Sequence, residues 1–150
     1  MSLGSIFDIA GSGMSAQSVR LNTTASNIAN AETASSSTGE TYRARKPVFS
    51  AVQDSLLNPG QGGFGPMGSD GEASAGVRVD GIVESDAELQ MRYEPNHPAA
   101  NADGYVFYPN VNVVEEMADM MSSSRSFQMN VDVMNTAKSM MQRILTLGQK

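Results

Sequence analysis

The chain has 150 residues, 16 acidic side chains against 10 basic ones, and a formal net charge of −6. This balance disfavours nucleic-acid binding, because the basic residues are scattered and phosphate contacts need a basic patch. There is no cysteine, so disulfides, thiolate–metal sites and cysteine nucleophiles are excluded. No apolar run reaches the length of a membrane span, and the segment "MSLGSIFDIAGSG" lacks the early positive charge of a secretory signal peptide.

The segment from about Leu3 to about Ile28 is predicted to be a long amphipathic helix. A companion row through Leu3 and Ala10 is weakened by the polar residues Gln17 and Thr24. Sustained heptads of this kind indicate packing against another helix along a narrow seam. The main apolar row repeats every seventh residue and consists of Phe7, Met14, Leu21 and Ile28.

The middle of the chain is predicted to be extended, with short strands and loops. Residues 41–53 carry β-branched and aromatic side chains, and Pro47 favours an edge strand or an extended arm. Residues 58–76 form a Gly-rich, low-complexity loop. Residues 77–95 alternate apolar and polar side chains, which indicates a hairpin or strand pair with Asp80-Gly81 as its candidate turn.

Residues 113–147 are predicted to form a second long helix. Asn112 and Glu115 have the spacing of a variant capping box, and Gly148 is the candidate C-cap. A helix of roughly 35 residues is roughly 50 Å long, which favours a coiled-coil or multi-chain setting over a small globular core. Its main apolar row is Val113, Met120, Phe127, Met134 and Met141, with the companion row Met117, Ser124, Val131, Lys138 and Leu145.

Methionines are concentrated in this second helix. Methionine adapts to irregular gaps, so we favour an interface that fits non-identical neighbours over ordinary core filling. Ile144 and Leu147 extend the apolar surface beyond one stripe, which predicts more than one partner. The methionines are Met117, Met120, Met121, Met129, Met134, Met140 and Met141.

The sequence predicts no catalytic, cofactor-binding or metal site. The run from Gly60 to Gly65 matches G-x-G-x-x-G, but it stands between two prolines without the strand and helix that the motif needs, so it indicates a flexible loop. His97 is the sole histidine and lies in a turn-rich stretch, and no G-x-S-x-G elbow marks a nucleophile. Glu84, Asp86 and Glu88 alternate in the manner of a solvated strand edge. We expect no enzyme activity, no cofactor and no metal.

The two ends of the chain resemble a known family. The segment "SIFDIAGSGMSAQSVRLNTTASNIANAET" resembles the N-terminal segment of bacterial flagellar axial proteins, whose Asn-rich helix end corresponds here to residues 25–31. The stretches "YEPNHPAANADGYVFYPNVNVVEEM" and "SRSFQMNVDVMNTAKSMMQRILTLGQ" are similar to the C-terminal half of proximal-rod members of that family. The resemblance covers almost the whole chain, except residues of about 53 to 76.

The resemblance implies a fold that is mainly α with a small β-rich middle. The N-terminal helix (1–30) and the C-terminal helix (111–150) would pair as a coiled coil on the inner wall of a tubular rod, with residues 31–110 outside. The chain would be exported unfolded by the flagellar type III apparatus, without a cleaved signal peptide, into a rod that crosses the periplasm. The rod would transmit torque and pass later substrates. We expect the terminal helices to be largely disordered before assembly.

The implied partners are other proximal and distal rod proteins and the MS-ring and export-gate end of the basal body. Nucleic acid, small-molecule substrates and membrane spanning are not expected. Three alternatives are another axial protein, an enzyme within the Gly-rich insertion, and an adaptor or secretion chaperone. Asp70 and Glu72 are the acids of that insertion and have no partner in view for catalysis.

The predicted functional residues fall into two groups. Asn27 and Asn30 lie on one helix face, where they could bind a neighbouring subunit or simply cap a fraying helix end. The predicted subunit interface comprises Asn27, Asn30, Met117, Met121, Ile144 and Leu147. The predicted intrachain seam comprises Phe7, Met14, Leu21, Ile28, Met120, Phe127, Val131, Met134, Met141 and Leu145.

Overall fold

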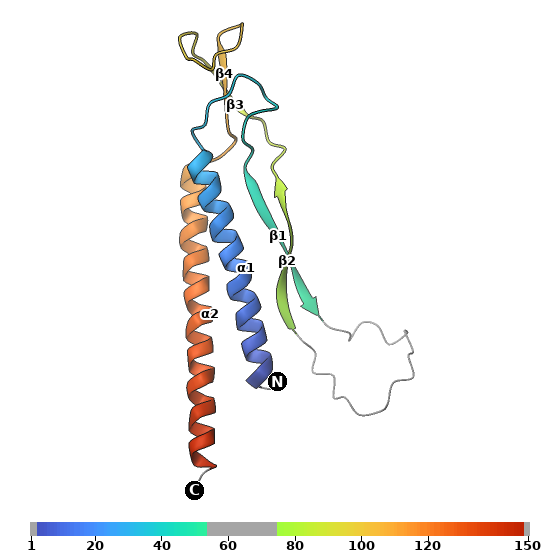
Figure 1. Ribbon diagram of the computed structural model, residues 1–150, viewed down its shortest axis with the longest axis vertical. Coiled ribbons are helices and arrows are strands. Elements are labelled where there is room, and N and C mark those ends of the chain that lie inside the picture. Colours follow the sequence, from blue (N-terminus) through green and yellow to red (C-terminus); the bar gives the residue numbers. More distant parts are fainter. Residues whose placement is uncertain (1–2, 54–74, 149–150) are drawn as a thin grey trace, which may run out of the picture.

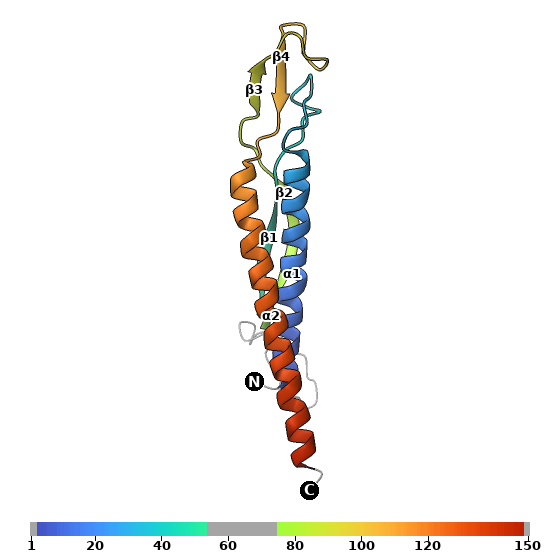
Figure 2. The ribbon, with the colours of Figure 1, turned by 90° about the vertical axis from the view of Figure 1, so that its left-hand side faces the viewer.

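The structure, a computed structural model, describes residues 3–53 and 75–148. Two long helices lie side by side in an elongated molecule, with a β ribbon along one of them and a small β tip at one end (Figures 1 and 2). Helix α1 (Leu3–Asn30) runs toward the tip and α2 (Val113–Leu147) runs away from it, so the helices are antiparallel. The predicted arrangement of two terminal helices around a small β middle is confirmed.

The ends of α2 are capped largely as predicted. Asn112 Oδ1 accepts a hydrogen bond from the backbone N–H of Val114 at 3.2 Å, and the N–H of Gly148 donates to the carbonyl of Ile144 at 3.0 Å. The capping box is only half formed, because the Glu115 carboxylate lies 3.3 Å from Lys46 Nζ instead of turning back to the cap. This salt bridge links the start of α2 to the first strand.

The ribbon consists of β1 (Arg45–Gln53) and β2 (Ala75–Glu84), paired antiparallel. Both strands are edges, which is compatible with Pro47 as the sequence predicted. The ribbon packs along α1, where Ser12 Oγ accepts a 3.1 Å hydrogen bond from the N–H of Val77. A side chain at Gly76 would come within 2.9 Å of that hydroxyl, so glycine permits the close approach.

The predicted turn at Asp80-Gly81 is wrong. Val48 pairs with Gly81 and Phe49 pairs with Val79, so Asp80 is the extra residue of a β-bulge inside a continuous strand. The predicted pairing within residues 77–95 is also wrong, because β2 pairs with β1 across the Gly-rich segment. That segment, including the Gly60–Gly65 motif, lies outside the described residues.

The tip is a second two-stranded sheet, β3 (Gln90–Tyr93) against β4 (Tyr105–Tyr108). Gly104 enters β4 with φ of +82°, and a Cβ there would lie 2.9 Å from the Tyr93 ring. Tyr93 and Tyr105 stack edge to face with ring centroids 5.2 Å apart. Ser35, from the segment after α1, exchanges two backbone hydrogen bonds with Phe107 and thereby ties that segment to β4.

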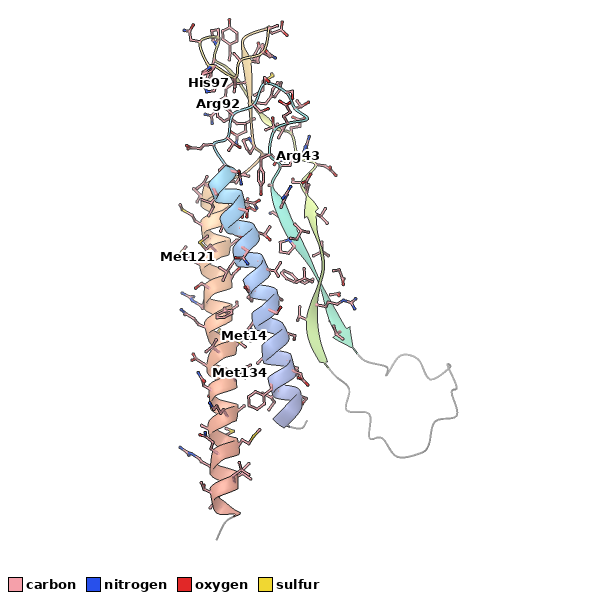
Figure 3. All side chains as sticks on the ribbon, in the orientation of Figure 1. Met14, Arg43, Arg92, His97, Met121 and Met134 are labelled. Atoms are coloured by element: carbon pink, nitrogen blue, oxygen red, sulfur yellow. The ribbon has the colours of Figure 1, made fainter. Side chains whose placement is uncertain are left out.

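His97 lies in the tip (Figure 3), and its Nδ1 accepts a hydrogen bond from the N–H of Ala99 at 3.1 Å. The predicted turn role of His97 is therefore confirmed. Buried apolar residues of the described chain are mostly small, whereas many large apolar side chains remain exposed, so much apolar surface is left for partners. The buried apolar residues are Ala10, Ala16, Ala44, Val106, Val111 and Ala137.

Candidate functional site

Small and polar side chains fill the line along which α1 and α2 meet. Asn27 Nδ2 donates to Glu116 Oε1 at 3.0 Å. Gly13 lies so close to α2 that a Cβ on it would come within 2.8 Å of Asn130 Nδ2. These two pairs fix the antiparallel register, because Gly13 and Asn27 are two heptads apart on α1, as Glu116 and Asn130 are on α2.

The predicted large apolar rows lie beside this line instead of at its centre. All eight predicted seam residues up to Met134 are half-buried. The register places Met14 near the level of Phe127, and Figure 3 labels Met14 and Met134 at the boundary between the two helices. Helices that meet on small residues approach more closely than helices that meet on large ones. These half-buried residues are Phe7, Met14, Leu21, Ile28, Met120, Phe127, Val131 and Met134.

The predicted places of Met141 and Leu145 in the intrachain seam stay a prediction. Their side chains are 37% and 64% exposed. The end of α2 extends past the first described residue of α1 (Figure 1), and the register puts Leu145 beyond the level of Leu3. The described residues of this chain therefore leave Ile144, Leu145 and Leu147 largely exposed at the end of α2.

Asn27 joins three segments of the chain. Its Nδ2 donates to the Arg45 carbonyl at 2.8 Å and to Glu116, and its Oδ1 accepts from the Arg45 N–H and from the Tyr42 hydroxyl, both at 2.9 Å. A primary amide has two donors and can accept two bonds, so all its capacity is used. Asn27 is 1% exposed, and its predicted role as a subunit contact is wrong because its partners lie within the chain.

Asn30, the companion of Asn27 in the prediction, differs from it. Its Nδ2 donates to the Ser26 carbonyl of the same helix at 2.8 Å, which fits the alternative of a helix-end bond. Asn30 is half-buried, and its contact with a neighbouring subunit stays a prediction.

Glu116 is a buried carboxylate at the junction of α1, α2 and β1. Burial raises the pKa of Glu116, and the hydrogen bond from Asn27 and the charge of Lys46 oppose that increase. About one turn beyond Glu116 on α2, Asp119 Oδ1 forms a salt bridge of 2.8 Å with Arg20 Nη2 of α1. Burial also raises the pKa of Tyr42, with the Arg45 guanidinium 5.4 Å above the ring opposing it. Thus the helix pair is joined by directional polar contacts at the end next to the tip.

Asn110 is a second junction residue, which sequence reasoning missed. Its Oδ1 accepts from the N–H of Ala44 at 2.8 Å, and its Nδ2 donates to the carbonyls of Ala87 at 2.9 Å and Ser85 at 3.3 Å. Arg43 Nη1 donates to the same Ser85 carbonyl at 3.1 Å. These bonds hold the start of β1 and the end of β2 against the entry to α2. The sole local signal was the Pro109-Asn110 dipeptide, which predicts a turn but no partner.

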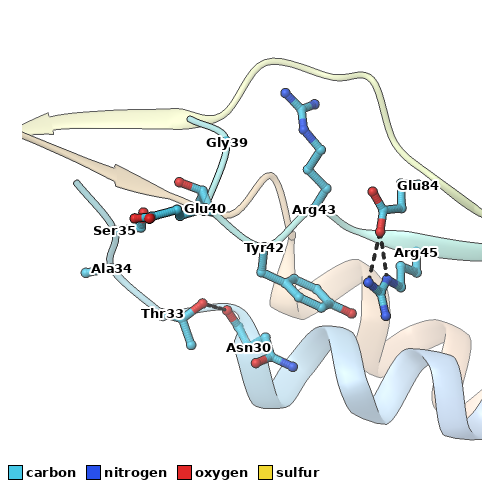
Figure 4. Close-up of a pocket in the computed structure, with 11 residues that line it drawn as sticks. Asn30, Thr33, Ala34, Ser35, Gly39, Glu40, Tyr42, Arg43, Arg45 and Glu84 are labelled. Atoms are coloured by element: carbon cyan, nitrogen blue, oxygen red, sulfur yellow. Dashed lines mark hydrogen bonds and ion pairs between the residues drawn. The ribbon is translucent and has the colours of Figure 1, made fainter. Parts of the chain in front are cut away.

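A cavity of about 480 Å³ opens beside this junction (Figure 4). Arg45 and Glu84 form a 2.9 Å salt bridge at its edge, while Arg43 points toward the segment that follows β2. Within residues 3–53 and 75–148, no cluster of three or more His, Cys, Asp or Glu residues is arranged to hold a metal ion. The lining mixes both charges with backbone groups from residues 30–45, and it forms no catalytic constellation.

The outer face of α2 carries exposed apolar side chains. Val114, Met117 and Met121 are 76%, 51% and 70% exposed, and Met121 projects away from α1 (Figure 3). Ile144 and Leu147 are also exposed. The four predicted interface residues among them are accessible, and their contact with other subunits stays a prediction. In the described ranges, no helix has both the length and the apolar character that a membrane span requires.

Comparisons with known proteins decide the family. Residues 7–34 match the family described as "Flagella basal body rod protein", and residues 102–147 match "Flagellar basal body rod FlgEFG protein C-terminal". The flagellar basal-body rod protein FlgC of Salmonella typhimurium is 47% identical over 99% of this chain and 100% of its own length. The FlgC proteins of Escherichia coli O6:H1 and Borreliella burgdorferi are 48% and 37% identical, each over 99% of this chain.

The chain belongs to the FlgC family of flagellar basal-body rod proteins. The resemblance inferred from the two ends of the sequence is thereby confirmed. The chain is a structural subunit of the rod and not an enzyme, and its place is the flagellar basal body. The alternative of an enzyme in the Gly-rich insertion is excluded by this assignment.

Proposed function

We propose that this FlgC family member polymerises with other rod proteins into the proximal part of a tubular drive shaft. The observation that carries the proposal is the antiparallel pair of α1 and α2, held in register by Asn27 with Glu116 and by Gly13 with Asn130. The half-buried apolar rows beside that line follow heptad spacing, which supports coiled-coil packing of residues 1–30 against 111–150. Residues 31–110 form the outer part of the subunit.

The position of the ribbon supports this division. β1 and β2 pack on α1, and Figure 1 shows them on the side of α1 away from α2. The outer face of α2 is therefore free to contact other helices, while the ribbon reaches neighbours on the opposite side. Such a subunit has helices on one side and strands on the other. On this proposal the helices form the inner layer of the tube and the strands form the outer layer.

The polar junction suits a shaft that transmits torque. Hydrogen bonds and ion pairs are directional, so the contacts of Asn27, Asn110 and Arg20 resist sliding and rotation better than apolar packing alone. We propose that the shaft crosses the periplasm and that its bore passes later export substrates. The partners on this proposal are proximal and distal rod proteins and the MS-ring and export-gate end, and the chain is exported without a cleaved signal.

The proposal is tested by replacing the gene with variants at adjacent positions of α2. Phe127 is half-buried beside the helix seam, whereas Gln128 is exposed. Phe127→Asp should remove the chain from purified basal bodies and abolish motility, because it places a charge in an apolar row. Phe127→Leu keeps the row apolar and should leave both unchanged, whereas Gln128→Asp adds the same charge at the heptad position of Met121 and probes the proposed outer-face contacts instead. Normal motility and incorporation of Phe127→Asp would overturn the seam assignment.

Mass spectrometry of basal bodies separates this proposal from the remaining alternatives. A rod subunit should be present in wild-type basal bodies, and loss of its gene should remove the distal rod and hook. An adaptor or secretion chaperone would be found in the cytoplasm, with complete basal bodies assembled in its absence.

A further inference from the structure

Methionine carries all the sulfur of this chain, and two methionines of α2 share a groove with an arginine. The chain has 11 methionines and no cysteine. Met121, Arg125 and Met129 follow one another at intervals of four residues, so each methionine is a neighbour of the arginine on the helix surface. The groove has a volume of about 350 Å³ and is lined by Ala118, Met121, Ser122, Arg125, Ser126 and Met129.

The two thioethers in the groove are open to solvent. Met121 and Met129 are 70% and 62% exposed, and Met121 projects away from α1 (Figure 3). By contrast, Met14, Met120 and Met134 are half-buried beside the helix seam. An oxidant must reach the sulfur atom to react with it, so the exposed pair should be oxidised before the half-buried residues.

Arg125 supplies hydrogen-bond donors inside the groove. Within residues 3–53 and 75–148, the salt bridges and side-chain hydrogen bonds join other residues, so its guanidinium has no competing partner there. A guanidinium has five N–H donors, and a thioether sulfur is only a weak acceptor. The oxygen of a methionine sulfoxide is a better acceptor, so Arg125 favours the oxidised form of both neighbours over the reduced form.

We infer that Met121 and Met129 form a modification site at which hydrogen peroxide oxidises the thioethers to sulfoxides, with Arg125 as the hydrogen-bond donor. In each step the sulfur lone pair attacks one peroxide oxygen, the O–O bond breaks and an S–O bond forms. The sulfur loses two electrons. The second peroxide oxygen leaves as water after it takes up the proton of the transferred oxygen. Methionine sulfoxide reductases reverse the oxidation, so the modification can be removed.

Oxidation at this site changes the character of the outer face of α2. A sulfoxide is polar, whereas the thioether that it replaces is apolar, and such a change weakens methionine-rich interfaces. Met121 lies on the face for which we predict contacts with other subunits. A chain that is oxidised before incorporation should therefore assemble less well, and this consequence rests on the proposed function.

The first test is limited oxidation of the purified chain with hydrogen peroxide, followed by peptide mass spectrometry of each methionine. Met121 and Met129 should be oxidised severalfold faster than Met14 and Met134, and this order should disappear in concentrated urea. Met117 is the matched control, because it is 51% exposed on the same helix but has no arginine or lysine three or four residues away. It should react more slowly than the pair. Equal rates at all methionines of the native chain would overturn the inference.

The role of Arg125 is tested in the same assay. Arg125→Gln should slow the oxidation of Met121 and Met129 severalfold and leave that of Met117 unchanged. Arg125→Lys keeps a charged donor and should slow the pair less. Rates at the pair that do not change in Arg125→Gln, or that do not exceed the rate at Met117, would show that exposure alone governs the reaction and would overturn the assigned site.

The effect on assembly is tested with the double variant Met121→Leu/Met129→Leu, which stays apolar and cannot form a sulfoxide at either position. Cells that carry the natural or the variant gene are exposed to sublethal hydrogen peroxide while rods assemble. The natural chain should be recovered in basal bodies in severalfold lower amount than the variant, and in equal amount without peroxide. If peroxide lowers both equally, the effect of oxidation on assembly is refuted and the proposed function stands. Absence of the natural chain from basal bodies without peroxide would instead remove the proposed function.

Discussion

The amide of Asn27 donates a 3.0 Å hydrogen bond to the carboxylate of Glu116, across the line where α1 and α2 meet. Both residues are buried, and Asn27 also binds both backbone polar groups of Arg45. One side chain therefore sets how the two helices and the first strand are placed relative to one another. Its removal would leave several buried polar groups without partners.

Replacing Asn27 with alanine should destabilise the chain strongly. The N–H and carbonyl of Arg45 and the carboxylate of Glu116 would lose their bonds, and each unsatisfied buried group costs about 1–3 kcal/mol unless water reaches it. We expect the free energy of unfolding to fall by about 2–4 kcal/mol, measured by urea titration of the helical signal of the purified chain. A helical signal in the purified chain would itself contradict the expectation that the terminal helices are disordered before assembly. Asn22→Ala, at an exposed site of the same helix, is the control and should change it little. Equal effects of the two variants would contradict the role of Asn27.

The raised pKa of Glu116 predicts a pH dependence of stability. Because burial raises this pKa above the unfolded value, the folded chain binds the proton more tightly. The resulting stabilisation is complete below the unfolded pKa and is lost as the pH rises through the folded pKa. Glu116→Gln removes the ionisation, and its Oε1 can still accept the bond from Asn27. The variant should therefore unfold at higher urea than the natural chain at about pH 7.

The control for Glu116 is the same urea comparison of the natural chain and the Glu116→Gln variant at acidic pH. At about pH 4, below the usual glutamate pKa, both carry a neutral side chain and the difference should shrink. Lys46, Asp119 and Glu115 also act on the pKa of Glu116, and they are common to both proteins. A difference that does not change with pH would show that Glu116 does not titrate with folding.

Two glycines of α1 should respond oppositely to alanine. Nothing lies within 4 Å of a Cβ built at Gly11, so Gly11→Ala should stabilise the chain by about 0.5–1 kcal/mol through helix propensity. A Cβ at Gly13 meets Asn130 Nδ2 at 2.8 Å, so Gly13→Ala should gain less or lose stability. Adding Asn130→Ala should restore the gain at Gly13. Urea midpoints of Gly11→Ala, Gly13→Ala, Asn130→Ala and the double variant decide the prediction, and equal gains at both glycines would contradict the close approach.

Alanine at Gly104 should destabilise the tip. Its φ of +82° costs a side chain about 1–2 kcal/mol, and contact with the Tyr93 ring adds to that cost. Hydrogen exchange should become faster in β3 and β4 but not in the middle of α2. Gly39→Ala, where nothing lies within 4 Å of the added carbon, should leave exchange unchanged. Unaltered exchange in Gly104→Ala would show that the tip does not need this conformation.

The helices could be predicted because their signals are local. Heptad repeats, the Asn112 cap and Gly148 located both ends of α2, and α1 extends only two residues past its predicted end at Ile28. The centre of the helix pair could not be found in the same way. Large apolar side chains in heptad rows do not point to Ser123 and Ala137, although a close helix contact needs such small residues.

The junction escaped prediction because its partners are distant in sequence. Asn27 and Glu116 are 89 residues apart, and the sequence around each residue contains no pattern that predicts their contact. The bulge at Asp80 illustrates a related limit. Asp-Gly is typical of hairpin turns, but β1 pairs through the whole length of β2, and the dipeptide becomes an irregularity within the strand.

The antiparallel course of α1 and α2 places Leu3 toward the same end of the molecule as Leu147, with the β tip at the other end (Figure 1). The two ends of the subunit therefore differ chemically. The β tip carries tyrosines and tight turns, whereas the end formed by Leu147 carries exposed aliphatic and methionine side chains. A tube in which all subunits have the same orientation is a polar assembly with two different ends. The surface that receives each incoming subunit then differs from the surface at the base, and elongation can be confined to one end.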